Sequence, residues 1–110
     1  MRVLLVDDDE GVLLTLAALL EDEGHGVSCA KTLAQARVEL SAAPFDAVLL
    51  DLQIGAEPGT LLIPDVAQRS PQARIVMLSG ASIDELPAGT HGAVLKGARV
   101  EEILALLAGA

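Results

Sequence analysis

Short apolar runs alternate with longer amphipathic stretches from one end of the sequence to the other. The short runs have the length and almost unbroken hydrophobicity that parallel strands show when helices cover both faces of their sheet. They predict five strands, at Val3–Val6, Val27–Cys29, Ala47–Leu50, Ile75–Leu78 and Ala93–Leu95. Because no repeat, low-complexity tract or linker interrupts this alternation, the sequence predicts a single domain over residues 1–110.

The longer stretches place apolar residues at helical spacing. They predict helices over residues 10–22, from Thr32 onward, and over about 98–108. Thr32 and Gln35 have the spacing of a capping box, which marks the start of the second of these helices. Pro64 lies inside a further helical stretch at 60–68, so that helix is expected either to kink or to begin late.

The connection before the last predicted strand is unusual. Ser82 and Glu85 form another capping box, but Pro87 and Gly89 follow so soon that about one helical turn is expected there. Right-handed crossovers limit how five parallel strands can be wound. The sequence therefore predicts a flavodoxin-like, doubly wound α/β domain with a five-stranded parallel sheet in the order 2-1-3-4-5 and a shortened fourth helix.

Composition and charge narrow the possible partners. The hydrophobic content of 52% excludes a disordered chain, and Phe45 as the sole aromatic residue argues against a base-stacking surface. A net charge of -9 disfavours direct binding to nucleic acid or to an anionic membrane. The longest apolar stretch, Val12–Leu20, is far shorter than the roughly 18 residues that a membrane span needs.

The single cysteine indicates the compartment. Cys29 cannot form a disulfide within the chain, which fits a reducing cytoplasm, and we expect its side chain to be a small buried apolar group.

Polar side chains follow four of the five predicted strands, at the point where each strand ends. Asp7 and Asp8 follow the first strand, Asp51 the third, Ser79 the fourth and Lys96 the fifth. Because the carboxyl ends of parallel strands share one edge of the sheet, all five residues are expected at that edge. In the predicted strand order the three carboxylates would lie within a few ångströms of one another.

Such a cluster of carboxylates needs compensation. Two of these charges about 4 Å apart repel each other by roughly 4 kcal/mol at an effective dielectric constant near 20. Either their pKa values are raised or a cation binds among them. Oxygen ligands with no nearby histidine or cysteine suit Mg²⁺ or Mn²⁺.

These residues resemble the receiver domain of two-component response regulators, over the whole chain. The resemblance rests on Val6-Asp7-Asp8, Leu49-Leu50-Asp51-Leu52, Met77-Leu78-Ser79 and Lys96, each at the end of a predicted strand. It implies that Asp51 accepts a phosphoryl group, that Asp8 binds Mg²⁺ directly and Asp7 largely through water, and that the Gln53 backbone carbonyl completes the protein ligands. It also implies that Ser79 hydrogen-bonds the phosphoryl group and that Lys96 pairs with it.

The chain departs from the family pattern around the last strand. Gly97 follows Lys96 where the family usually has a proline, so a cis peptide bond is not expected there. Ala93 stands where the family usually has a tyrosine or phenylalanine. The segment from Ser79 to Lys96 is shorter than usual, and Ile54-Gly55 replaces the usual Met-Pro.

Three functions follow as alternatives. The first is a phosphorylatable receiver, not an enzyme in the ordinary sense, although it could promote its own phosphorylation and dephosphorylation. Its partners would be a histidine kinase or histidine phosphotransfer protein and a downstream protein or output domain, and the chain would be a monomer or weak dimer. The second is a pseudo-receiver, an interaction module with the same fold that does not use phosphorylation.

The third alternative is a haloacid dehalogenase-like phosphatase. Such enzymes have an Asp-x-Asp nucleophile motif, which is mimicked here by Asp7-Asp8-Asp9. We reject it because no acidic pair follows a strand after Lys96, and because Asp51 would have no role.

Overall fold

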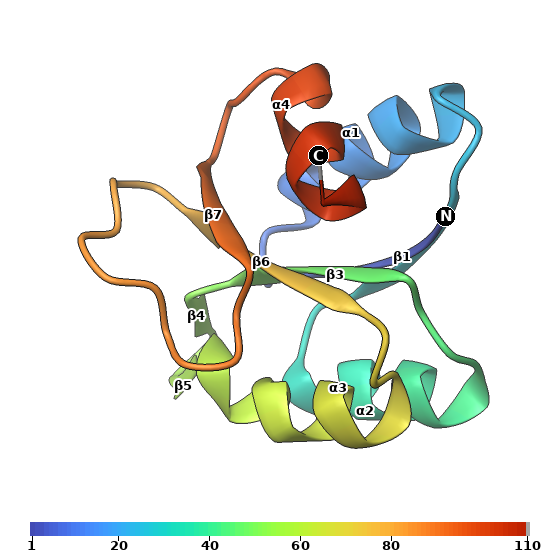
Figure 1. The fold of residues 1–110 in the computed structure, drawn as a ribbon, viewed down its shortest axis with the longest axis vertical. Coiled ribbons are helices and arrows are strands. Elements are labelled where there is room, and N and C mark those ends of the chain that lie inside the picture. Colours follow the sequence, from blue (N-terminus) through green and yellow to red (C-terminus); the bar gives the residue numbers. More distant parts are fainter. Residues whose placement is uncertain (110) are drawn as a thin grey trace.

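The structure, a computed structural model, describes residues 1–109, and it consists of one central sheet between two layers of helices (Figure 1). Its main strands are β1 (Arg2–Val6), β2 (Gly26–Ala30), β3 (Ala47–Asp51), β6 (Arg74–Ser79) and β7 (Gly92–Leu95). Its helices are α1 (Glu10–Asp22), α2 (Leu33–Ala42), α3 (Ile63–Arg69) and α4 (Val100–Ala108).

The five main strands are all parallel and lie in the order β2-β1-β3-β6-β7. This is the predicted order 2-1-3-4-5, because β4 (Gln53–Ile54) and β5 (Glu57–Pro58) pair with each other in a separate small hairpin. The flavodoxin-like fold class is therefore confirmed.

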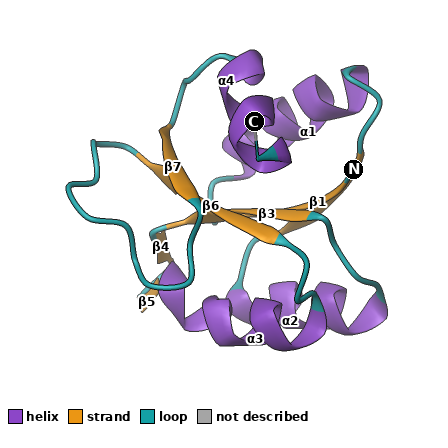
Figure 2. Ribbon diagram, viewed as in Figure 1, coloured by secondary structure: helices purple, strands orange, loops and turns teal. Residues whose placement is uncertain are grey.

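Helices α1 and α4 cover one face of the sheet, and α2 and α3 cover the other (Figure 2). Each strand contributes to both halves of the core because successive side chains point to opposite faces. In β1, Leu4 and Val6 pack on the side of α2 and α3, whereas Val3 and Leu5 pack on the side of α1 and α4. All five residues of β3 are buried, so this strand is the centre of the domain.

The helix starts follow local side-chain chemistry. The Thr32 hydroxyl accepts a hydrogen bond from the Gln35 backbone N–H at 3.0 Å, as the capping box predicted. The stretch around Pro64 begins late: a 3₁₀ turn over Gly59–Leu62 precedes α3, and Pro64 occupies the first turn, where its missing N–H costs nothing.

Two predictions are wrong. Residues 80–91 contain bends and turns but no helix, so the single turn expected from Ser82 and Glu85 is absent. Pro87 and Gly89 leave no continuous helical stretch for that capping box to start. Cys29 is exposed rather than buried, because β2 is an edge strand that pairs only with β1.

Within residues 1–109, the longest helix has 13 residues, and none has the length and apolar character of a membrane-crossing segment.

Candidate functional site

Three carboxylates meet at the carboxyl edge of the sheet. Asp7 and Asp8 follow β1, and Asp51 is the last residue of β3, which is the neighbour of β1. One oxygen from each carboxylate lies within 4.8 Å of the other two. Asp7 and Asp51 are buried, with only 1% of Asp7 exposed, whereas Asp8 is open to solvent. The structure thus brings together the three acidic residues that the sequence analysis singled out.

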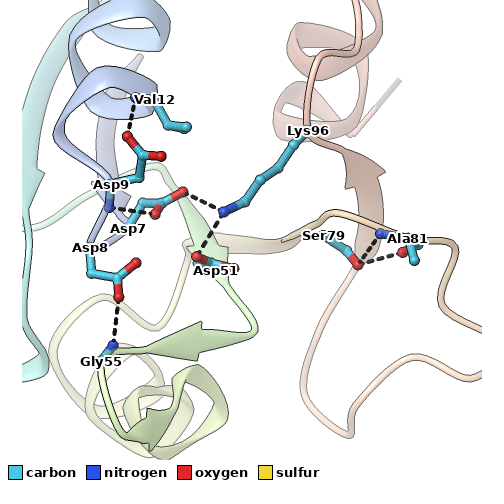
Figure 3. Close-up of polar contacts among 9 residues, drawn as sticks. All are labelled: Asp7, Asp8, Asp9, Val12, Asp51, Gly55, Ser79, Ala81 and Lys96. Atoms are coloured by element: carbon cyan, nitrogen blue, oxygen red, sulfur yellow. Dashed lines mark hydrogen bonds and ion pairs between the residues drawn. The ribbon is translucent and has the colours of Figure 1, made fainter.

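Lys96 reaches this cluster from the end of β7 (Figure 3). Its Nζ atom lies 3.0 Å from Oδ2 of Asp51, to which it donates a hydrogen bond, and 3.2 Å from Oδ2 of Asp7. One ammonium group therefore stands between the two buried carboxylates and reduces their mutual repulsion.

The two oxygens of Asp7 have different surroundings. Oδ1 accepts a hydrogen bond of 2.9 Å from the Asp9 backbone N–H. Oδ2 is fully buried and accepts no hydrogen bond of acceptable geometry, although the Lys96 ammonium is close. Because a buried carboxylate oxygen is costly without a partner, Asp7 Oδ2 depends on the positive charge of Lys96 or of a further cation.

Protonation equilibria reflect this arrangement. Burial raises the pKa of Asp7, and the charge of Asp51 raises it further, against the lowering effects of the Asp9 N–H and of Lys96. Burial by itself would lower the pKa of Lys96, but its contacts with Asp51 and Asp7 outweigh that effect, so the pKa is raised. The raised pKa keeps Lys96 protonated at neutral pH, whereas the raised pKa of Asp7 means that the fold disfavours its charged form.

This donor set fits a hard divalent cation. The three side chains offer carboxylate oxygens, one of which is buried with only the Lys96 ammonium near it, and Asp8 is exposed to solvent. Mg²⁺ and Mn²⁺ favour such ligands and retain several of their waters.

The β4–β5 hairpin, which the sequence analysis missed, closes the site on one side. The Gly55 backbone N–H donates to Oδ2 of Asp8 at 2.9 Å and ties this hairpin to the end of β1 (Figure 3). Gln53 is the first residue of β4, and its exposed side-chain amide donates to the Gly55 carbonyl at 3.3 Å. Two-residue strands leave no periodicity to detect, so only the turn residue Gly55, at φ +61°, could have indicated the hairpin.

At Gly59 the chain passes close to the backbone of Asp51. The Gly59 N–H donates to the Leu52 carbonyl at 2.7 Å, and a Cβ atom placed on Gly59 would overlap the Asp51 backbone carbonyl oxygen. This glycine is needed for close approach of two backbone segments, which fixes the position of Asp51.

Ser79 is at the same edge, at the end of β6, but its hydroxyl turns away from the carboxylates. It is hydrogen-bonded to both the carbonyl and the N–H of Ala81, the latter at 3.2 Å (Figure 3). The structure therefore brings Lys96 into the acidic cluster and leaves Ser79 outside it.

The peptide bond after Lys96 is trans, as expected, and Gly97 adopts φ +87°. Ala93 lies in the middle of β7, partly buried on the side of α2 and α3. Ala93 and Ser79 both line a groove of about 230 Å³ beside β7.

Comparisons with known proteins agree with this geometry. The family model of the response regulator receiver domain matches residues 3–108. The chain is 34% identical over 100 residues to the alginate biosynthesis transcriptional regulatory protein AlgB of Pseudomonas putida, which covers 86% of this chain and 22% of that protein. It is 33% identical over 78 residues to the photosynthetic apparatus regulatory protein RegA of Rhodovulum sulfidophilum, covering 71% of this chain and 43% of RegA.

Solved structures match as well. A response regulator from Burkholderia pseudomallei, with a phosphorylated aspartic acid, calcium ion and citrate, superposes with a TM-score of 0.89 and 32% identity. This match covers 96% of the present chain and 65% of that one. The chemotaxis protein CheY4 of Vibrio cholerae shares the fold at a TM-score of 0.88 and 23% identity, covering 98% and 96% of the two chains. The chain therefore spans about a fifth of the length of AlgB and nearly all of CheY4.

Proposed function

The chain belongs to the response regulator receiver domain family, and from this premise we propose that it accepts a phosphoryl group on Asp51 in a two-component or phosphorelay system. One observation carries the proposal. The Asp51 carboxylate lies 3.0 Å from the Lys96 ammonium and beside two further carboxylates that have the chemistry of a cation site. Receiver domains are signalling phosphoacceptors, and we assign this chain no turnover of a separate substrate.

The transfer step uses Asp51 as the nucleophile. A carboxylate oxygen of Asp51 attacks the phosphorus atom of a phosphohistidine donor. The new P–O bond forms while the P–N bond breaks, and the electron pair leaves with the imidazole nitrogen, which then takes up a proton. Two anionic groups must approach each other in this step, and Lys96 offsets their repulsion.

Asp7, Asp8, Asp51 and the Gln53 backbone carbonyl would hold a divalent cation, with Asp8 binding it directly and Asp7 largely through water. A bound Mg²⁺ or Mn²⁺ supplies positive charge to the phosphoryl oxygens. The buried Oδ2 of Asp7 supports this assignment, since Lys96 at 3.2 Å is the single cationic group that faces it among the described residues, and a divalent cation would add positive charge there.

Ser79 would change its partner during the reaction. Its hydroxyl, now bonded to Ala81, would turn toward a phosphoryl oxygen on Asp51 and donate a hydrogen bond to it. Lys96 would pair with another phosphoryl oxygen, because its ammonium already contacts the Asp51 carboxylate.

The partners follow from the family. We propose a histidine kinase or histidine phosphotransfer protein as donor and a downstream protein or output domain as target, in the cytoplasm. The Burkholderia response regulator carries a phosphorylated aspartic acid with a calcium ion, which supports the same combination here.

A pseudo-receiver is the second candidate. The missing helix at 80–91 and the small Ala93 favour it, because both alter the side of the domain that would read phosphorylation. In that case the fold would serve as an interaction module without phosphoryl transfer.

Incubation with acetyl phosphate and Mg²⁺, followed by intact mass measurement, tests the proposal. Wild-type protein should gain the mass of one phosphoryl group, and EDTA should prevent this gain. Asp51→Asn should gain nothing, because an amide is not nucleophilic. Asp65→Asn is the matched control, since Asp65 is paired only with Arg37 at 3.1 Å, and it should be phosphorylated normally.

Each other outcome has a definite meaning. Phosphorylation of Asp51→Asn would refute the acceptor assignment. If the wild-type protein is folded but gains no phosphoryl group, the result would favour the pseudo-receiver.

A further inference from the structure

The turn of the β4–β5 hairpin is built around Gly55. Ile54 of β4 pairs with Glu57 of β5, so Gly55 and Ala56 form a two-residue loop between them. Gly55 has φ +61° and Ala56 has no positive φ, which is the pattern of a type II′ turn. The first loop residue of such a turn needs a positive φ, and a glycine adopts it without strain.

The departure from the family pattern at position 55 has a structural consequence. A proline, the usual residue there in the receiver family, would hold φ at about −65° and has no backbone N–H. It could form neither this turn nor the hydrogen bond of 2.9 Å that the Gly55 N–H donates to Oδ2 of Asp8 (Figure 3). The contact between the hairpin and Asp8 therefore depends on the glycine of this chain.

Asp8 has no other polar contact that holds its side chain. It is exposed, and the Gly55 N–H is the single hydrogen-bond donor to its carboxylate among residues 1–109. Asp7 and Asp51, in contrast, are buried and contact Lys96. Without the Gly55 bond the exposed carboxylate would be free to change its rotamer. With it, one oxygen of Asp8 lies within 4.8 Å of oxygens of Asp7 and Asp51.

The N–H donor is itself held in place by the residues around it. Ile54, directly before Gly55, is buried in the core on the side of α2 and α3. At the other end of the hairpin, the Gly59 N–H donates to the Leu52 carbonyl at 2.7 Å. The hairpin is thus anchored at both ends, and it presents the Gly55 N–H to Asp8 from a fixed position.

We propose that the backbone N–H of Gly55 is a positioning group for the divalent cation, an inference that rests on the cation site of the proposed function. The N–H holds the Asp8 carboxylate in the geometry for binding, and it does not contact the cation itself. Hydrogen bonds of this kind orient metal ligands, and removing one typically weakens metal binding about 10- to 100-fold. Because Asp8 is exposed, we expect a loss at the lower end, of about tenfold.

The same hairpin would provide a second ligand. The Gln53 backbone carbonyl, which we propose as a cation ligand, belongs to β4. A bound cation would therefore contact the hairpin directly at Gln53 and act on Gly55 through Asp8. Mg²⁺ should slow amide hydrogen exchange in residues 53–57 as well as in Asp7 and Asp8.

Amide hydrogen exchange of the metal-free, ¹⁵N-labelled full chain tests the contact itself. Asp8→Ala removes the acceptor and should speed exchange of the Gly55 amide about tenfold, as expected for the loss of one hydrogen bond to a charged group. Asp8→Asn retains an acceptor oxygen and should keep most of the protection. The Gly59 amide, which bonds to Leu52, is the internal control and should exchange equally in all three proteins.

A Mg²⁺ titration followed by amide NMR tests the effect on the cation. Gly55→Pro deletes the N–H and should raise the Kd for Mg²⁺ about tenfold. Gly55→Asn is the matched variant, because asparagine keeps the N–H and tolerates a positive φ, and a Cβ atom at this position meets nothing within 4 Å. Its Kd should stay within about twofold of wild type.

A double variant separates the role of Asp8 from that of the rest of the hairpin. In the Asp8→Ala protein, Gly55→Pro should weaken binding no further, because the N–H acts through the Asp8 carboxylate. Mn²⁺ is the probe for this pair, since water-proton relaxation reports its weak binding. A further loss as large as that in wild type would mean that Gly55 acts through Gln53, and it would overturn the inference.

The remaining outcomes are also decisive. Equal or tighter Mg²⁺ binding by Gly55→Pro would overturn the inference and leave the cation site in place. If Gly55→Pro does not fold, unchanged exchange of the Gly55 amide in Asp8→Ala would overturn it alone. Failure of the wild type to bind Mg²⁺ would instead refute the proposed cation site, and the inference with it.

Discussion

The two halves of the sheet's carboxyl edge differ in how many contacts hold them in place. At the ends of β1 and β3, buried carboxylates contact a lysine, a hairpin is tied to Asp8, and Gly59 packs against the Asp51 backbone. At the ends of β6 and β7, Ser79 bonds only to its own loop, no helix covers the connection, and a groove opens beside Ala93.

This difference suggests that the proposed phosphoryl-transfer site and the region that would have to move after phosphorylation lie in separate parts of the domain. The side around Asp51, the proposed acceptor, has a fully buried strand and close backbone packing, which suits a reaction that needs fixed geometry. The other side has few fixed contacts, and it is the side that would have to move if a phosphoryl group were sensed. We infer that the acceptor chemistry is preserved while the coupling to the rest of the domain is weak.

The largest effect is expected from Gly59→Ala, which tests how tight the acceptor side is. The new methyl group would overlap the Asp51 carbonyl oxygen, so the backbone must shift, and we expect the free energy of unfolding to fall by about 3 kcal/mol or more. Denaturant unfolding measures this loss.

Gly80→Ala is the matched control, because a Cβ atom there meets nothing within 4 Å and Gly80 does not require positive φ. Its stability should stay within about 0.5 kcal/mol of wild type. Equal losses for the two glycine variants would remove the contrast in packing.

Asp8→Asn should produce the next largest effect. The amide oxygen can still accept the Gly55 N–H, but one charge leaves the carboxylate cluster. Without metal, we expect the melting temperature to rise by about 5 °C, the shift that ~1 kcal/mol produces in a domain of this size. The rise in melting temperature that Mg²⁺ causes in wild type should largely disappear.

Asp46→Asn is the control for removing a carboxylate that lies outside the cluster. Asp46 also accepts one backbone N–H, that of Arg2 at 2.7 Å, but it lies outside the cluster. A Mg²⁺ response that survives Asp8→Asn, or one that Asp46→Asn abolishes, would contradict the assignment of the cation site.

A smaller effect is expected from pH. The raised pKa of Asp7 means that the folded domain without metal loses stability as pH rises from about 3.8 through that pKa, since the unfolded chain ionises more easily. A cation needs Asp7 ionised, so the Mg²⁺-induced rise in melting temperature should be small near pH 4 and should grow toward pH 7. Differential scanning fluorimetry across this range measures it, and an equal Mg²⁺ effect at both ends would contradict the account.

Much of the fold followed from the sequence because its signals are local and consistent. Almost unbroken apolar runs predicted the strands, and right-handed crossovers left few ways to order them. The capping residues Thr32 and Gln35 gave a correct helix start because apolar periodicity continues after them. The same motif at Ser82 failed because no such periodicity follows it.

The site was predictable in position but not in detail. Chain topology alone brings Asp7, Asp8, Asp51 and Lys96 to one edge. The orientation of the Ser79 hydroxyl depends on the loop that follows it, whose conformation has no sequence pattern. The exposure of Cys29 depends on which strand lies at the edge and on what covers it, which hydrophobicity does not reveal.

The central claim, that the acceptor side is intact and its coupling to the last helix is weak, is tested most directly by amide NMR with a phosphoryl mimic such as beryllofluoride and Mg²⁺. Ala93 has no side-chain rotamers with which to register a movement of Ser79. We predict strong shifts for residues 51–55 and 79–92 and weak shifts for residues 98–108. Large shifts throughout 98–108 would show that a switch operates without an aromatic side chain at position 93, and would contradict the account.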